Sequence, residues 1–184
     1  MNAPLPWHGP IVSLNGMKQI LLILAVVALV GGCGGKKEDG NTGVVNPNKP
    51  SPKAVPVNIA NPIVEKVIRA QLKKPTGELT QADLEKVPGL SLESHQLTDV
   101  KDLEKLPQLK ALDLSSNKLT SVNGLEKLTQ LTMLNLAYSP KLTDVKGLEK
   151  LTQLKELNLD WSFSIPRAQI AELRKALPNC KIIK

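Results

Sequence analysis

The chain has 184 residues and a formal net charge of +7, and its length is that of one or two domains. Its two cysteines and two histidines exclude a disulfide-dense scaffold and a cysteine- or histidine-rich metal cluster. We therefore expect no metal and no other cofactor. Aromatic residues make up only 2% of the chain, so leucine and other aliphatic side chains must build the core.

The amino-terminal region is typical of an export signal. Lys18 precedes the apolar residues 20–30, a run too short for a membrane span of roughly 20 residues but suited to a secretory signal. Residues 30–33, Val-Gly-Gly-Cys, resemble the lipobox of bacterial lipoproteins, although the family prefers Leu first and Gly31 is unusual second. The resemblance implies cleavage before Cys33, lipid attachment to its sulfur and usually acylation of its new amino group. The alternative is an ordinary signal peptide with an incidental cysteine.

The segments around this motif differ sharply in composition. Residues 1–16 contain three prolines and no Lys or Arg, so we expect them to be a mis-assigned start, with translation beginning at Met17. Residues 17–32 then form the lipoprotein signal peptide. Residues 33–56 are rich in Gly and Pro and cannot bury much apolar surface, so we expect a disordered tether.

A repeated motif organises the rest of the chain. Leu-x-Leu pairs recur at spacings of 22, 22 and 23 residues, and leucine supplies 21 of the 76 residues in 84–159. In a short strand Leu112 and Leu114 would point inward, with Asp113 outward between them. The chain then returns through a helical turn at residues 125–128. A single coil cannot bury its leucines, so successive coils must stack.

This pattern resembles the leucine-rich repeats of internalins, from residue 57 onward. The resemblance implies an α/β solenoid with parallel strands on a concave face and short 3₁₀ or helical turns on a convex face. It divides the chain into a helical cap (57–88), the repeats (89–162) and a carboxyl-terminal cap (163–184). The family places Asn in the turn after each strand, a position held here by His95, Asn117, Ser139 and Ser162. We therefore expect less regular turns on this side.

Local signals support the amino-terminal cap. Asn61 and Pro62 suit the N-cap and first position of a helix. The apolar face of that helix would hold Ile63, Val64, Val67, Ile68, Ala70 and Leu72. Thr80, three residues before Asp83, predicts a second helical start.

The carboxyl-terminal signals are of the same kind. Residues 164–166 predict the start of a helix whose apolar face holds Ile170, Leu173 and Leu177. Residues 177–183 align with 106–112, which puts Cys180 in a leucine position and predicts a buried structural thiol. The third coil carries one extra residue near 139–141, which should bulge.

The outward strand positions form the candidate binding surface. The first four strands offer twelve such residues, and none is Lys or Arg although the chain is basic. Tyr138 and Trp161 follow the last two of these strands at matching positions, so we expect them to be neighbours at one edge. Tyr138 should be exposed, and Trp161 is either exposed or covered by the last helix. The candidate ligand-binding residues are Asp113, Asn135, Tyr138, Asn158, Asp160 and Trp161.

Two other functions are disfavoured. Ser94, His95 and Asp99 are the one cluster with catalytic residue types, but Ser94 and His95 are adjacent and would point to different sides. We expect no catalytic residue and no enzyme. The positive charge gives no concentrated nucleic-acid surface, because each convex turn carries a lysine directly after a glutamate, namely Lys105, Lys127 and Lys150.

We therefore expect an exported lipoprotein of the cell envelope whose solenoid binds another macromolecule, most simply a protein. In a host with two membranes, Gly34 rather than Asp after Cys33 indicates the outer membrane, by the sorting habit of enteric-type bacteria. The alternative is a structural lipoprotein without a dedicated ligand, and an enzyme is a distant third.

Overall fold

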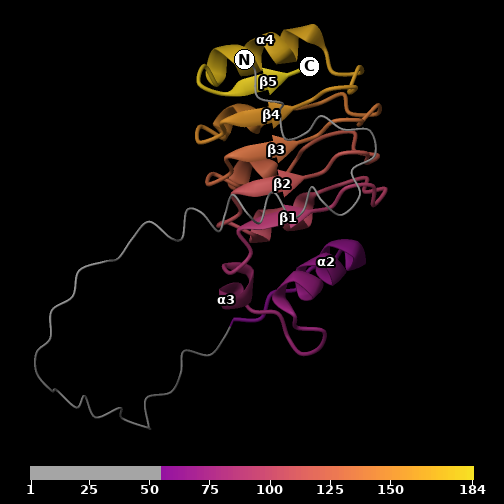
Figure 1. Ribbon diagram of the computed structural model, residues 1–184, viewed down its shortest axis with the longest axis vertical. Coiled ribbons are helices and arrows are strands. Elements are labelled where there is room, and N and C mark those ends of the chain that lie inside the picture. Colours follow the sequence, from indigo (N-terminus) through magenta and orange to yellow (C-terminus); the bar gives the residue numbers. More distant parts are fainter. Residues whose placement is uncertain (1–54) are drawn as a thin grey trace, which may run out of the picture. The chain divides into compact units, whose positions relative to one another are not determined.

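The computed structural model describes residues 55–184, which form successive coils that each add one strand to a parallel sheet (Figure 1). For this part of the chain the predicted α/β solenoid is confirmed. The expected signal peptide, Cys33 and nearly all of the expected tether lie outside the described residues. None of the helices within residues 55–184 could span a bilayer.

The sheet contains one strand from each coil, in chain order. Its strands are β1 (Gly89–Ser91), β2 (Ala111–Asp113), β3 (Met133–Asn135), β4 (Glu156–Asn158) and β5 (Lys181–Ile183). The parallel register aligns the central residues of these strands in one column, namely Leu90, Leu112, Leu134, Leu157 and Ile182. The 22-residue spacing therefore stacks leucine on leucine, as the repeat predicts.

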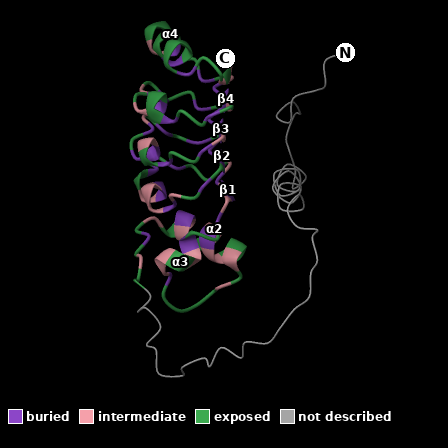
Figure 2. Cartoon of the chain, turned by 90° about the vertical axis from the view of Figure 1, so that its left-hand side faces the viewer, coloured by how far each residue is buried: buried purple, intermediate pink, exposed green. Residues whose placement is uncertain are grey.

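A second layer of helical turns lies behind the sheet. It consists of the 3₁₀ turns η1 (Lys101–Lys105), η2 (Leu125–Lys127) and η3 (Leu148–Lys150), followed by helix α4 (Arg167–Ala176). Figure 2 shows the strand layer and the turn layer side by side, with buried residues in both. Gly124 and Gly147 precede η2 and η3 with φ of +102° and +98°, a conformation that residues with a Cβ rarely adopt. A Cβ at Gly124 would also lie 3.0 Å from the Cα of Lys101.

The core between the two layers is aliphatic. It is a single cluster of Leu, Val and Ile side chains, in which Leu112, Leu114 and Leu134 are fully buried. The three aromatic side chains within residues 55–184 all lie at the surface. The low aromatic content of the sequence therefore reflects a core that uses no rings at all in this part of the chain.

The amino-terminal cap consists of α2 (Pro62–Leu72) and α3 (Gln81–Leu84). The Asn61 side chain accepts hydrogen bonds from the first amides of α2, and Thr80 and Asp83 cap α3 reciprocally, so both predicted helix starts are confirmed. Val64 and Ile68 form the buried centre of the apolar face of α2, and Ile63, Val67 and Leu72 pack beside them. Ala70, expected on this face, is exposed.

Helix α2 also covers the first edge of the sheet. Gln71 Nε2 donates to the carbonyl oxygen of Gly89 at the start of β1 (2.7 Å). The hydrogen-bonding groups of an uncovered parallel edge would otherwise be open to other strands.

The carboxyl-terminal cap differs from the prediction in its last strand. Helix α4 buries Ile170 and Leu173 as expected. The alignment of repeats predicts Ile183 in the central column of the sheet, but Ile182 holds that place opposite Leu157. β5 begins one residue after Cys180. In the earlier coils the strand begins two residues after the equivalent leucine, as β2 does after Leu109. Cys180 packs against the core but is only partly buried, so its burial is less complete than its leucine position predicts.

The extra residue of the third coil forms a bulge, as predicted. The Leu142 amide donates to the Ser139 carbonyl oxygen (3.0 Å), which closes a turn that the other coils lack. Pro140 and Lys141 lie exposed at its tip. The turn absorbs the insertion without disturbing the register of β3 and β4.

Candidate functional site

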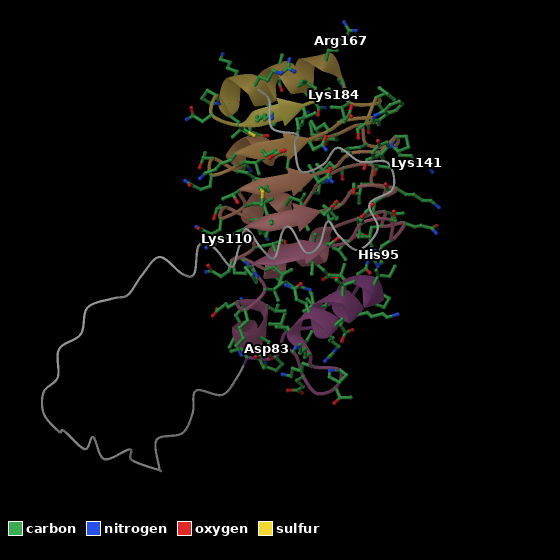
Figure 3. All side chains as sticks on the ribbon, viewed as in Figure 1. Asp83, His95, Lys110, Lys141, Arg167 and Lys184 are labelled. Atoms are coloured by element: carbon green, nitrogen blue, oxygen red, sulfur yellow. The ribbon has the colours of Figure 1, made fainter. Side chains whose placement is uncertain are left out.

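The first four strands all end in the same left-handed turn. The residues at this position, which we call the carboxyl rim, are Ser94, Ser116, Tyr138 and Trp161, with φ of 59°, 58°, 55° and 58°. Their amides link successive coils, since Ser94, Ser116 and Tyr138 each donate to a carbonyl oxygen of the next coil at 2.9–3.0 Å. The first residue of each turn is therefore regular. The turns differ after it, as predicted, because the first coil adds a second left-handed residue at Gln96 and the third coil adds the bulge at Ser139. Figure 3 labels His95, Lys141 and Lys184 along the same edge, where the strand arrows end.

Three exposed aromatic side chains form a cluster on the carboxyl rim. The rings of Tyr138 and Trp161 are stacked, with centroids 5.9 Å apart and planes at 9°. Phe163 meets Trp161 edge-on, with centroids 5.6 Å apart. Tyr138 and Trp161 are each 53% exposed and Phe163 is 74% exposed. The predicted neighbours are confirmed, and Trp161 is open to solvent rather than covered by α4.

The backbone makes this a costly place for large side chains. A left-handed conformation costs an L-residue roughly 1–2 kcal/mol, and Gly and Asn tolerate it best. The first two coils place serine there, whereas Tyr138 and Trp161 occupy it in the next two. Exposed apolar groups on a strained backbone are typical of binding sites rather than of structural positions.

Phe163 is the functional candidate that the sequence did not reveal. Repeat alignment found Tyr138 and Trp161 because they share one position in successive coils. Phe163 has no equivalent in the other coils. Its signal was its rarity, since it is the sole phenylalanine of the chain and lies two residues after Trp161.

Three predicted ligand contacts have a structural task instead. Asp113, Asn135 and Asn158 are only 6%, 5% and 6% exposed. The Oδ1 atom of each accepts a hydrogen bond from the amide two residues later, at 2.9, 3.1 and 3.0 Å, and so forms the turn that leads to the carboxyl rim. These three side chains are therefore largely covered, and their contact with a ligand stays a prediction.

Behind the carboxyl rim, buried polar side chains join the coils. Asn117 accepts from the Leu97 amide (2.9 Å) and donates to the Leu92 carbonyl oxygen (2.8 Å), both in the preceding coil. Ser162 Oγ donates to the Leu136 carbonyl oxygen (2.8 Å) in the same manner. The position that the internalin resemblance assigns to Asn is therefore used twice to hold coils together.

The cluster considered for catalysis does not assemble. His95 is exposed, and its Nδ1 donates to the Glu93 carbonyl oxygen within the same turn (2.7 Å). This bond replaces the missing Asn locally but does not join two coils. No hydrogen bond links the side chains of Ser94, His95 and Asp99 within residues 55–184, and this part of the chain contains no group of three metal-ligating side chains.

The outer face of the sheet is acidic along its first four strands. Its four acids are Glu93, Asp113, Glu156 and Asp160. Burial raises the pKa of Glu93, and the nearby charge of Asp113 raises it further. Asp160 is partly exposed. It lies near Lys184, whose pKa is lowered by burial, and the charge of Asp160 offsets part of that lowering. Lys181 of β5, opposite Glu156, and Lys184 directly after β5 therefore limit the cation-free surface to the earlier coils.

The convex turns η1 and η2 carry paired charges. Lys127 Nζ lies 2.7 Å from Glu104 Oε2 in the preceding coil, and this contact raises the pKa of the lysine and lowers that of the glutamate. Lys105 pairs with Asp102 at 2.5 Å. This pairing agrees with the interpretation of the convex lysines as a solvated face.

Comparisons with known proteins agree with the repeat. Residues 107–147 match the family model described as leucine-rich repeats, two copies. An internalin of Listeria monocytogenes is 30% identical with a TM-score of 0.54, over 59% of this chain and 33% of that one. Internalin C2 of the same species is 26% identical with a TM-score of 0.60, over 67% of this chain and 53% of that one.

A leucine-rich-repeat protein of Leptospira interrogans is 31% identical with a TM-score of 0.50, over 56% of this chain and 26% of that one. The chain thus spans between a quarter and about half of the length of these three structures. A search of curated proteins finds no match. The fold is that of leucine-rich repeats, which is commonly used for protein binding rather than for catalysis.

Proposed function

We propose that this leucine-rich-repeat chain, with a fold similar to that of internalins, binds another protein through the carboxyl rim and is held at the cell envelope by lipids on Cys33. The exposed cluster of Tyr138, Trp161 and Phe163 is the observation that carries the binding function. Tyrosine and tryptophan are strongly enriched among the residues that dominate protein interfaces.

The geometry favours a dedicated ligand over a purely structural role. A scaffold needs packed coils, and the buried leucines provide them without any surface ring. Tyr138 and Trp161 add apolar surface at a left-handed backbone position, and the first two coils have serine at the same position. Stability alone offers no reason for that arrangement, whereas a binding partner that covers the rings does.

The proposed anchor rests on the motif of residues 30–33. A single acyl chain binds membranes only weakly, so stable residence requires two or more chains. Diacylglyceryl transfer to Cys33 with acylation of its amino group would supply them. We propose the outer membrane as the destination in a host that has two membranes, because Gly34 follows Cys33.

Binding is tested by comparing substitutions on the two faces. Parent, Tyr138→Ala and Trp161→Ala chains, each immobilised, are exposed to envelope and surface proteins, and a retained partner is then titrated against each variant. We expect each rim substitution to weaken binding by more than about 1 kcal/mol, while Lys127→Ala on the convex side has little effect. Equal losses on both faces, or losses confined to Lys105, Lys127 and Lys150, would contradict the proposal.

Anchoring is tested separately with Cys33→Ser and a matched control, Cys180→Ser. We expect Cys33→Ser to release a soluble or uncleaved protein, while Cys180→Ser still fractionates with membranes. Mass spectrometry of the membrane form should find lipidated Cys33 at the amino terminus. An unprocessed chain beginning with Met1 in purified membranes would refute both lipidation and the start at Met17.

A further inference from the structure

Two carboxylates lie on the outer face of the sheet next to the carboxyl rim. Glu93 directly precedes Ser94, and Asp113 lies in β2 opposite Ser91, so the two acids come from the first and second coils. Residues two apart on a strand share a face, so Glu93 lies diagonally across from Asp113 on the outer face. Burial raises the pKa of Glu93, and the charge of Asp113 raises it further. Like charges at a partly desolvated surface repel each other unless a cation lies between them.

The described part of the chain supplies no such cation. Its ion pairs lie in the caps and on the convex turns, at Glu65–Arg69, Lys74–Asp83, Lys86–Asp83, Lys105–Asp102 and Lys127–Glu104. None of them involves Glu93 or Asp113. At the other end of the sheet Glu156 lies opposite Lys181 and Asp160 has Lys184 nearby. The acids that lack a neighbouring lysine are therefore those of the first two coils.

We infer that the partner is a protein segment that places a Lys or Arg side chain against Glu93 and Asp113 and an apolar side chain against the aromatic cluster. The inference rests on the binding function proposed above and adds the chemistry of the partner. Charge complementarity selects the cation, and the three exposed rings select the apolar group.

The coil spacing defines the distance between the two groups. Adjacent parallel strands lie about 4.8 Å apart, so the acids of the first two coils and the rings of the third and fourth lie about 5–14 Å apart along the rim. An extended segment rises about 3.3 Å per residue. The basic and apolar residues should therefore be two to four positions apart in an extended partner.

The chain itself offers a variant that removes the charge and keeps the turn. Asp113, Asn135 and Asn158 make the same hydrogen bond through Oδ1 in three successive coils. Asp113→Asn should therefore fold like its neighbours, and Glu93→Gln retains the side-chain shape. Glu172→Gln, on the exposed side of α4, is the matched control.

The probe is a library of random decapeptides displayed on phage and selected against the full chain. We expect the enriched peptides to carry Lys or Arg two to four positions from an aromatic or aliphatic residue. They should bind the Glu93→Gln/Asp113→Asn variant about tenfold more weakly and Glu172→Gln unchanged. Replacing the basic residue of the peptide by Ala should cause the same loss, and the double variant should then cause no further loss. Unchanged thermal unfolding of the variants confirms that they fold.

The failures can be told apart. Enriched peptides that lose affinity with Tyr138→Ala but bind the charge variant within twofold would overturn the cationic partner and leave the proposed function standing. Peptides indifferent to Tyr138→Ala would overturn both. Glycan binding or self-association that depends on Trp161 but not on Glu93 would also overturn the inference, because a carbohydrate or a second copy would then occupy the rim.

Discussion

The backbone amide of Ser139 donates to the side-chain hydroxyl of Ser162 in the next coil (3.1 Å). That hydroxyl in turn donates to the Leu136 carbonyl oxygen (2.8 Å), so one serine bridges two coils. Asn117 does the same between the first two coils with a longer side chain that makes four hydrogen bonds. The hydroxyl of Ser162 therefore replaces the side-chain amide of Asn117 as the link between coils, with two hydrogen bonds fewer.

Ser162→Ala should destabilise the protein. The substitution leaves the Ser139 amide and the Leu136 carbonyl oxygen unpartnered at a fully buried position, which costs about 1–3 kcal/mol. Urea unfolding followed by far-UV circular dichroism measures the loss. Thr129→Ala, at an exposed position, is the control and should change stability by less than about 0.5 kcal/mol. Equal midpoints for the two variants would show that the bridge contributes nothing.

The leucine core should be sensitive to truncation. Leu112, Leu114 and Leu134 are fully buried, so replacing each by Ala should cost about 2–5 kcal/mol through lost burial and an unfilled cavity. Leu134→Met keeps the volume and should cost less than about 1.5 kcal/mol. Chemical unfolding gives both values, and a cost below 1 kcal/mol for the Ala variants would argue against this core.

Tyr138→Gly should separate stability from binding. Glycine relieves roughly 1–2 kcal/mol of left-handed backbone strain, but it loses about 0.5–1.5 kcal/mol of ring contact and about 0.5–1 kcal/mol through added chain entropy. These effects nearly cancel, so the unfolding free energy should stay within about 1 kcal/mol of the parent. Partner binding, measured by calorimetry, should fall by more than about 1 kcal/mol. A large loss of stability would instead make Tyr138 a structural residue.

Cys180 should react slowly with thiol reagents in the folded protein. Burial, together with the charge of Glu156, raises the pKa of its thiol to about 11, so little reactive thiolate is present at pH 8. The unfolded chain ionises nearer pH 9, so this group also makes stability fall as the pH rises above 9 and on through 11. Labelling with a chromogenic disulfide, with and without urea, measures the difference. Equal rates would mean that the last coil does not shield the thiol.

The repeat period predicts the backbone better than it predicts side-chain direction. Spacing alone placed Leu112 and Leu134 side by side, and β2 and β3 pair in that register. The same alternation assigned Asp113 and Asn135 to an open surface, yet their oxygens turn along the chain to bond amides two residues later. Period-2 reasoning identifies a face of a strand, whereas local side-chain-to-backbone bonds decide what remains free on it.

Features without a copy in another coil were the hardest to predict. The bulge at Ser139 was visible as an extra residue, but the register of β5 depends on one residue missing after Cys180. Phe163 has no repeat partner that would mark it. The left-handed turns were hidden because Tyr138 and Trp161 are residue types that seldom adopt positive φ.

Because the core of residues 55–184 contains no rings, the near-ultraviolet signal of this region comes from its surface. Trp161 is already about half in contact with water in the folded state, and its indole is flanked by Tyr138 and Phe163 rather than by the leucine core. A partner that excludes water from the aromatic cluster should therefore change the fluorescence of Trp161 while the leucine core stays folded. The signal from Trp161 would report whether the rim is occupied.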